Sequence, residues 1–320
     1  MNSTTLKKEQ SGFKLSAKTV KSIVPFLGLI FIIVFFQVTT GGRLLSARNL
    51  KTFANYAFSA IIPCCGGIFL MSQGNMDYSL AGNICVSAAL GAMVSQTSIP
   101  LAILVMIVAS LTMGAINGTI CIFLGVNSFI ATLGASFMYG GLASVLLGGG
   151  SITANYDFKN IDTLVFKYGT VLVVAVIALI VFNYTSFGKH CRSIGARQEV
   201  AHQAGVRVRL ERFIPFLISG LACAIMATFT LVRTCNATVT SGGNTQINTM
   251  LGLLLGGVPF SGGWNSKFRS VIIGGLIMAV VDNGLFLLNL TVPTQQLIKG
   301  FIFIVAVAIS FDRENTAVIK

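Results

Sequence analysis

The feature that most constrains this chain is a series of long apolar runs that have no polar face. Residues 172–182 read LVVAVIALIVF, and a helix built from them would be hydrophobic on every side. Because 54% of the 320 residues are hydrophobic and only 10% are charged, one soluble core cannot hide this apolar surface. A soluble enzyme would need amphipathic helices instead. The sequence therefore predicts a polytopic integral membrane protein.

Ten apolar segments follow one another along the chain. All are expected to be helical, because a backbone that faces lipid must satisfy its own hydrogen bonds. The predicted fold class is therefore all-α, with about ten transmembrane helices in one membrane domain over residues 22–311. Two segments, around Ser79 and Thr249, are short or interrupted by glycine and are expected to be broken or partly re-entrant. The segments are 23–38, 52–71, 79–95, 98–124, 127–148, 164–183, 211–232, 248–258, 269–290 and 294–311.

The cationic residues predict how the chain is oriented. A basic N-terminal tail over residues 1–21 contains five lysines, and residues 184–212 contain one Lys and five Arg. Ten crossings that start and end in the cytoplasm, with a C-terminal tail over residues 312–320, place 15 of the 22 Lys and Arg on the cytoplasmic side. The positive-inside rule favours this arrangement, which needs an even number of helices before residue 184.

Two N-terminal stretches need separate interpretation. Residues 39–51 place three cations on the outer side, and we expect them to form an amphipathic helix in the headgroup region. A basic tail followed by an apolar run is also how a cleavable signal peptide begins, but no small-x-small cleavage site follows closely. We therefore expect a retained signal-anchor helix.

Several functional classes are disfavoured by the residues present. The formal net charge of +13 comes from cations at segment ends, not from an exposed stripe with interleaved aromatics, so no nucleic-acid partner is expected. His190 and His202 have no metal-ligand spacing with the cysteines, most of which lie in apolar runs as small hydrophobes. A catalytic triad and a phosphate-binding loop are also missing from the sequence. We therefore predict no enzyme activity, no metal site and no cofactor.

Charged residues within the apolar part of the chain are few. Asp77, Arg233 and Asp282 stand inside apolar segments or at their ends. Each would cost about 2.5 to 3.5 kcal/mol at the centre of a bilayer, so each is expected to face protein, water or a partner. Ion-coupled transporters use such carboxylates, but the chain has only nine acidic residues in all. We favour a structural carboxylate at a helix end for Asp77.

Four motifs, in order along the chain, resemble the membrane permeases of ribose-type bacterial ATP-binding-cassette importers. The resemblance covers roughly residues 20–311, and four ordered motifs are far more specific than any one of them. The motifs are GNMDYSLAG from Gly74, NSFIATLGASFMYGGLA from Asn127, TSFGKHCRSIGARQEVAHQAGVRV from Thr185 and LGLLLGGVPFSGGWN from Leu251.

The resemblance implies a multi-pass transport subunit in the bacterial inner membrane, surrounded by lipid. Such permeases act as dimers of like or identical chains, with two cytoplasmic ATPase subunits and an extracytoplasmic solute-binding protein. FSGGW from Phe260 is similar to a signature of the ATPases, but it stands in a short turn, so ATP hydrolysis belongs to a partner. Residues 184–212 would contain the helix that couples to the ATPase. The coupling residues that the resemblance implies are Gly188, Lys189, Arg192, Ser193, Ile194, Gly195, Ala196 and Gly205.

One departure from the family pattern concerns the partner chain. Members usually have a Glu-Leu pair where this chain has Gln246 and Ile247. The missing carboxylate would change the contact that the chain makes with its binding protein or with the second permease chain. A heterodimer with a different permease is therefore an alternative to a homodimer.

The substrate is left open by the sequence. The family imports pentoses, hexoses and related polyols, and similar permeases handle furanosyl signalling molecules. A stand-alone secondary transporter or channel for a small polar solute is the alternative function, and it would need no ATPase. Hydrogen bonding between helices explains buried polar residues equally well. The pathway residues suggested by side-chain type are Asp77, Ser79, Asn117, Asn127, Thr132 and Asn283, together with Tyr139.

Overall fold

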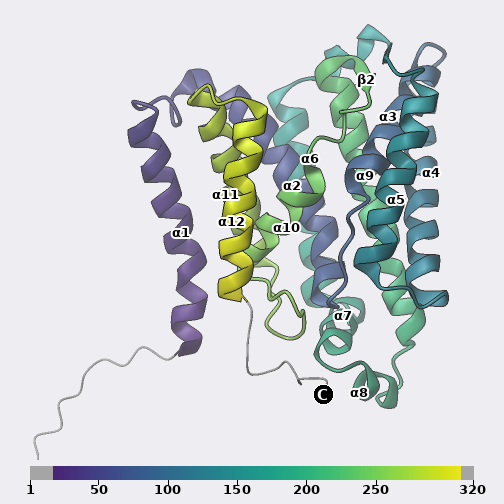
Figure 1. Ribbon diagram of the computed structural model, residues 1–320, viewed down its shortest axis with the longest axis vertical. Coiled ribbons are helices and arrows are strands. Elements are labelled where there is room, and N and C mark those ends of the chain that lie inside the picture. The colour runs from purple at the N-terminus through teal and green to yellow at the C-terminus, as the bar shows by residue number, and fades with distance from the viewer. Residues whose placement is uncertain (1–16, 311–320) are drawn as a thin grey trace, which may run out of the picture.

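The computed structural model describes residues 17–310 and shows a bundle of helices that run side by side (Figure 1). Each of the ten predicted apolar segments contains a helix, and two short helices lie between the sixth and the seventh. The helices are α1 (Ala17–Thr39), α2 (Leu50–Ser72), α3 (Leu80–Ser95), α4 (Ile99–Gly118), α5 (Ser128–Leu146), α6 (Leu164–Tyr184), α7 (Ser186–Ala196), α8 (Gln198–Gln203), α9 (Val208–Thr234), α10 (Thr245–Leu255), α11 (Arg269–Leu287) and α12 (Val292–Ser310).

Among the described residues, six helices are long and apolar enough to cross a membrane: α2, α4, α5, α6, α9 and α11. The helices expected to be short are short. α3 has 16 residues and α10 has 11, so α10 extends only about 16 Å. Residues 73–79 connect α2 to α3 without helix. The chain therefore passes through part of the bundle as non-helical backbone.

The all-α prediction was incomplete. Two loops form a small antiparallel sheet from β1 (Ser151–Thr153) and β2 (Asn236–Thr238), with Ser151 paired to Thr238. Short turns of other helix types, Ala47–Asn49, Thr119–Phe123 and Tyr156–Ile161, complete the described elements. Backbone pairing between loops satisfies polar groups at the end of the bundle, where neither loop has a helix to supply partners.

The two ends of the bundle differ. In Figure 1, α7 and α8 lie at the bottom, where α1 also begins and α12 ends, whereas β2 lies at the top. The path from α1 to α7 therefore returns to the end at which it began, in agreement with an even number of helices before the basic segment. That segment is largely helical rather than a loop, because α7 and α8 occupy residues 186–203 and α9 already begins at Val208.

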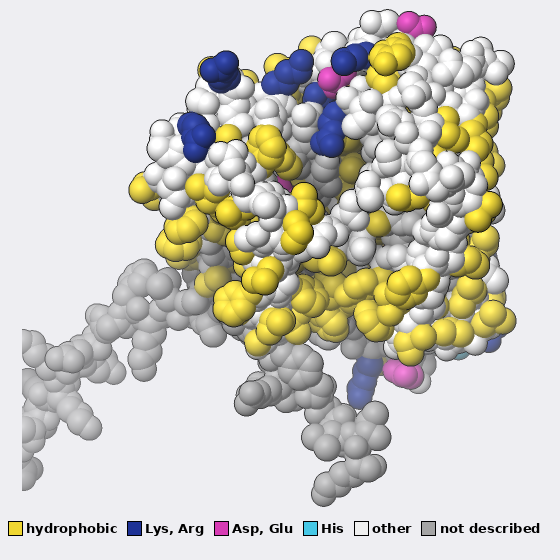
Figure 2. All heavy atoms as spheres, turned by 45° about the horizontal axis from the view of Figure 1, so that its top comes forward, with side chains coloured by type: hydrophobic (Ala, Val, Ile, Leu, Met, Phe, Trp, Pro, Cys, Tyr) yellow, Lys and Arg dark blue, Asp and Glu magenta, His cyan; other side chains and the backbone are white. Residues whose placement is uncertain are grey.

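Residues 39–51 differ from the expected amphipathic helix, and that prediction was wrong. After α1 ends at Thr39 the chain forms turns, and the short Ala47–Asn49 helix continues directly into α2. Arg43, Arg48 and Lys51 are exposed. Figure 2, in which the top of Figure 1 comes forward, shows Lys and Arg side chains on this end of the molecule. Arg43 lies outside any helix, Arg48 lies in the short helix and Lys51 lies in the first turn of α2, so no single amphipathic helix carries the three cations.

Burial separates inner helices from outer ones. α2, α9 and α11 are mostly buried, whereas only a minority of residues in α4, α5 and α6 are buried although these helices are strongly apolar, as expected for helices that face lipid. α4 and α9 approach closely at Gly114 and Gly220. A Cβ on Gly114 would lie 2.5 Å from the Phe216 carbonyl oxygen, and one on Gly220 would lie 2.6 Å from the Ser110 carbonyl oxygen. Glycine at both positions therefore permits backbone-to-backbone packing.

Candidate functional site

Helix α7 is seated on the end of the bundle by one buried face. Gly188, Cys191 and Ile194 repeat every three residues and are buried, so they share one side of the helix. α7 contacts α2, α6 and α9, and Ile194 packs with Ala201 and Val208 in a small apolar cluster. α7 is therefore a docked helix with one face turned away from the bundle.

Gly195 lies where three segments meet. The Gly263 N–H donates to the Ser72 carbonyl oxygen at 2.8 Å, which joins the end of α2 to the turn over residues 259–268. A Cβ on Gly195 would overlap both that carbonyl oxygen and the Gly263 nitrogen. Only glycine leaves room for this contact, so α7, α2 and the turn are locked at one point.

Arg192 fastens the same junction from the side. Its guanidinium carbon lies 5.1 Å from the centre of the Phe182 ring and 5.5 Å from that of Trp264, and its Nη2 donates to the Phe182 carbonyl oxygen at 3.3 Å. Cation–π contacts with both rings position the side chain. Trp264, the chain's single tryptophan, is nevertheless 59% exposed.

Seven of the eight predicted coupling residues fall into two groups on α7, and the eighth, Gly205, lies apart from them. Gly188, Arg192, Ile194 and Gly195 hold α7 on the bundle, as described above. Lys189 and Ala196 are exposed on its outer face with the half-buried Ser193 between them. Gly205 is an exposed turn residue with φ of +83° and no atom near its Cβ position. We call the outer residues Lys189, Ser193 and Ala196, with the neighbouring Trp264, the α7 surface.

Trp264 was not among the predicted coupling residues, because its motif was considered only for its similarity to an ATPase signature. The signal that would have found it is an exposed tryptophan in a turn, since large aromatics left open to solvent mark contact surfaces. The structure adds that Ala196 lies against Gly263, the residue before it. The turn and α7 therefore share one surface.

Cys191 provides a test of how firmly α7 is seated. Its side chain is fully buried; burial raises the pKa of the thiol to about 12, although a hydrogen bond at 3.2 Å from Gln73 Nε2 opposes this shift. A thiol attacks reagents as the thiolate, so we expect Cys191 to resist maleimide at pH 8 in the folded protein. Mass spectrometry should show it modified only after denaturation. Rapid modification of the native chain would show that α7 detaches.

The non-helical segment 73–79 runs from this junction into the bundle. Gln73 Nε2 also donates to the Glu211 carbonyl oxygen at 2.7 Å, and Arg212 Nη2 donates to Asn75 Oδ1 at 3.3 Å. Glu211 in turn pairs with His190 of α7 through an Oε1–Nδ1 distance of 2.9 Å. Side chains from α7 and from the first turns of α9 therefore hold the lower end of the segment.

Farther along the segment, α5 supplies acceptors for the backbone. The Met76 N–H donates to Ser128 Oγ at 3.3 Å, and the Tyr78 N–H donates to Thr132 Oγ1 at 2.9 Å. Thr132 is fully buried. Its hydroxyl therefore replaces the backbone hydrogen bond that a helix would have provided here.

The carboxylate of Asp77 is surrounded by donors. Ser79 N donates to Oδ1 at 2.9 Å, Ser79 Oγ to Oδ1 at 2.6 Å, and Ser219 Oγ to Oδ2 at 2.8 Å. Asn117 Nδ2 then donates to Ser79 Oγ at 2.7 Å, and the Tyr139 hydroxyl to Asn117 Oδ1 at 3.0 Å. Asp77 also precedes the N-terminus of α3, where the helix dipole favours negative charge. This geometry supports the structural interpretation of Asp77.

The structure brings together most, but not all, of the predicted pathway residues. Asp77, Ser79, Asn117 and Thr132 meet around segment 73–79, with Tyr139 behind Asn117. Two asparagines lie elsewhere: Asn127 is exposed and caps α5 by accepting from Phe129 N at 3.0 Å, and Asn283 is fully buried in α11. Within residues 17–310 neither amide atom of Asn283 has a hydrogen-bond partner. Ser219 was missed, and the signal for it was a serine inside the apolar segment 211–232.

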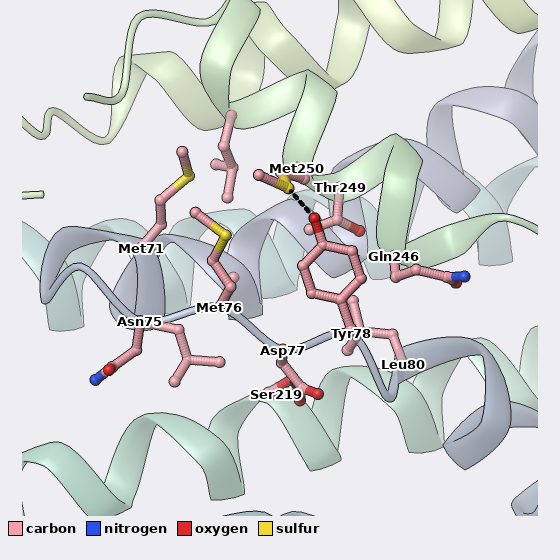
Figure 3. A pocket seen from close by; sticks show the side chains of 13 residues that line it. Met71, Asn75, Met76, Asp77, Tyr78, Leu80, Ser219, Gln246, Thr249 and Met250 are labelled. Atoms are coloured by element: carbon pink, nitrogen blue, oxygen red, sulfur yellow. Dashed lines mark hydrogen bonds between the residues drawn. The ribbon is translucent and has the colours of Figure 1, made fainter. Parts of the chain in front are cut away.

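Two cavities flank Tyr78. The first, beside Asp77, has a volume of about 30 Å³ and is lined by α2, segment 73–79, α9 and α10. The second has a volume of about 320 Å³ and lies between α10 and α12. Tyr78 and Met250 border both cavities, and the Tyr78 hydroxyl lies 2.9 Å from Met250 Sδ. Figure 3 shows Tyr78 reaching toward α10 while Asp77 points the opposite way, toward Ser219.

A buried ion pair stands beside the larger cavity. Lys299 Nζ lies 2.5 Å from Asp282 Oδ1 and 3.2 Å from Asn248 Oδ1, and Asn248 Nδ2 donates to Asp282 Oδ2 at 2.9 Å. The three residues come from α12, α11 and α10, so this triad joins three helices. Asp282 faces protein, as expected because a charged side chain exposed to lipid would cost free energy. Lys299 was missed; its signal was a single cation in the apolar segment that follows Asp282.

Comparison with known proteins gives a consistent result. Residues 49–307 match the model of the family described as "Branched-chain amino acid transport system / permease component". The chain is 27% identical to a ribose import permease of Bacillus subtilis, over 93% of this chain and 94% of the relative. It is 25% identical to a xylose transport system permease of Haemophilus influenzae, over 95% and 99% of the two chains.

A galactose/methyl galactoside import permease of Salmonella typhimurium is 28% identical, over 87% of this chain and 89% of the relative. No solved structure matches the chain. The family match covers the four motifs and the helices that carry them, from residue 49, just before α2, to α12. The chain therefore belongs to the branched-chain amino acid transport system / permease component family, as a relative of the ribose-type ATP-binding-cassette importer permeases that its motifs resemble.

Proposed function

We propose that this chain is the transmembrane permease subunit of an ATP-binding-cassette importer for a monosaccharide. The observation that carries the proposal is the family match over residues 49–307, together with relatives named as ribose, xylose and galactose permeases along most of their length. In this proposal the chain works as a dimer in the bacterial inner membrane. A partner ATPase hydrolyses ATP, and a solute-binding protein delivers the sugar.

The α7 surface supports a division between the two ends of the bundle. It lies on a helix whose opposite face is buried, at the end where α1 begins and α12 ends (Figure 1). The segment 184–212 around it carries one Lys and five Arg, as expected for a cytoplasmic face. We assign the ATPase contact to this surface and the binding-protein contact to the end that bears β1 and β2.

Segment 73–79 supplies a route for mechanical coupling. Gln73 touches Cys191 on α7, and Tyr78 stands between the two cavities. Because the segment is non-helical and is hydrogen-bonded at both ends, a displacement of α7 can move Tyr78 without unwinding a helix. Rocking of the two permeases, driven by ATP binding in the partner, then changes which side the pathway faces.

The proposal is tested by uptake into proteoliposomes. The complex that co-purifies with this chain should take up D-ribose, D-xylose or D-galactose only when ATP is inside the vesicles with the ATPase and the binding protein is on the opposite side. The chain alone should show no net uptake under a proton or sodium gradient. Gradient-driven uptake by the chain alone would identify a secondary transporter instead.

Trp264 tests the α7 surface directly. Exposed tryptophans are often hot spots of protein contacts, worth about 2 kcal/mol or more, so Trp264→Ala should lower the recovery of the ATPase with the permease about tenfold or more. Tyr156→Ala is the matched control, because Tyr156 is an aromatic side chain that is 72% exposed in the loop after β1. Quantitative pull-down from detergent measures both. Equal recovery for the two variants would remove Trp264 from the contact.

A further inference from the structure

The cavity between α10 and α12 is lined by none of the predicted pathway residues. Its volume of about 320 Å³ lies at the lower end of the range for small-molecule sites, about 300–1,000 Å³. The pocket beside Asp77, at about 30 Å³, has room for about one water molecule. Of the two, only the α10–α12 cavity is large enough for a solute the size of one sugar ring.

The walls of this cavity combine apolar surface with hydrogen-bonding groups. Tyr78 and Phe303 contribute rings, and Asn244 and Gln296 contribute amides that both donate and accept. A monosaccharide has C–H faces that pack on rings and hydroxyl groups that exchange hydrogen bonds with amides. The lining therefore suits a polyhydroxy ring better than a purely apolar ligand.

Lys299 adds a fixed donor. It lines the cavity and is only 7% exposed. An ammonium group has three N–H donors, and contacts with Asp282 and Asn248 occupy two of them. Among residues 17–310 no protein acceptor is recorded for the third. A hydroxyl or ring oxygen in the cavity is the group that would complete the coordination of this ammonium.

The charge balance of the triad selects against ionised solutes. Asp282 is 8% exposed and neutralises Lys299 at 2.5 Å, so the pair has no net charge. A carboxylate or phosphate in the cavity would have to separate this buried pair or lie beside Asp282, and both arrangements leave a charge unpaired at high cost. An uncharged solute requires neither.

We propose that the α10–α12 cavity is a binding site for one uncharged, ring-sized polyhydroxy solute, held by Lys299 and the amide of Asn244, with Gln296 at the exposed edge of the cavity. Tyr78 and Met250 close this site toward the Asp77 pocket. The proposal rests on the proposed transport function, since it names the place and chemical class of the substrate within that function.

Sugar protection of a cysteine placed in the cavity tests the site. All seven native cysteines are buried, so Gln296→Cys is expected to be the main site of maleimide reaction in the assembled complex in proteoliposomes. D-ribose, D-xylose or D-galactose should slow labelling at least threefold, whereas D-galacturonate should not. Thr294→Cys is the matched control, because Thr294 is exposed in the first turn of α12 and does not line the cavity. Its labelling should be unaffected by any sugar.

The outcomes separate the two proposals. If the vesicles take up a sugar in an ATP-dependent manner but that sugar never protects Gln296→Cys, the site is wrong and the transport function stands. Protection without uptake supports the site and counts against the transport function. Protection by D-galacturonate as strong as that by neutral sugars would overturn the predicted selectivity.

A double substitution tests the triad within the site. Asp282→Asn with Lys299→Met removes both charges, so neither partner is left as an unpaired buried ion. In the Gln296→Cys background, sugar protection should be lost while the ATPase still co-purifies with the permease. Protection that persists in a complex of normal composition would show that Lys299 does not hold the solute.

Discussion

Gly195→Val is expected to abolish ATP-driven uptake in proteoliposomes, with initial rates at least tenfold below the native complex. A Cβ at residue 195 would overlap the Ser72 carbonyl oxygen and the Gly263 nitrogen. These are backbone atoms, so no rotamer change relieves the overlap, and α7 must lift from the end of α2. Overpacking of this kind typically costs about 1 to 3 kcal/mol. The displaced helix would no longer present the α7 surface in the correct position.

Gly169→Val in α6 is the matched control, because a Cβ there has no atom within 4 Å. It should retain native uptake. The folded state of both variants is checked by monodisperse elution in detergent and by the reactivity of Cys191, which should increase in Gly195→Val as α7 lifts. Normal uptake by Gly195→Val would show that the junction of α7 with α2 does not transmit force.

Asp77→Ala should destabilise the permease more than any other single substitution considered above. Three donors, from Ser79 and Ser219, would lose their acceptor at once, and each unsatisfied buried group costs about 1 to 3 kcal/mol. We expect the free energy of unfolding to fall by about 3 kcal/mol or more. Thermal unfolding in detergent should show this as a clearly lower midpoint, with a matching loss of folded yield.

Asp77→Asn is the graded control, since it keeps one oxygen for Ser79 while the Ser219 hydroxyl can rotate to accept from the new amide. Its loss should be roughly 1 kcal/mol, about the worth of a typical hydrogen bond. If Asp77→Ala instead unfolds like the native chain but takes up no sugar, Asp77 contacts the solute and its structural role is refuted.

The positions of the helices were predictable because lipid imposes a simple rule on them. An apolar run that faces hydrocarbon has to form its own hydrogen bonds, so each run indicates one helix whatever its neighbours are. The β1–β2 pairing was not predictable, because it joins two loops that follow different helices. The prediction of an amphipathic helix over residues 39–51 failed because the chain there also has to turn between α1 and α2. An amphipathic pattern predicts a helix only where no turn competes with it.

The candidate site was predicted in part. Asp77, Ser79, Asn117 and Thr132 were found by residue type, but their arrangement depends on segment 73–79, whose hydrogen-bond partners come from α5 and α9. The pairing of Lys299 with Asp282 could not be predicted from the sequence, because it depends on how α11 and α12 are oriented relative to α10. Gly195 was identified by motif, whereas its physical role follows only from the position of the Ser72 carbonyl oxygen.

Segment 73–79 also has a consequence for how the protein is made. Its hydrogen-bond partners lie downstream: Thr132 is 54 residues after Tyr78, and Ser219 is 142 residues after Asp77. At about 5 to 20 residues per second, Ser219 is synthesised roughly 7 to 28 s after Asp77. During that interval the exposed backbone and carboxylate need water or a chaperone at the insertion machinery. The first helices of this permease therefore cannot complete their fold until α9 has entered the membrane.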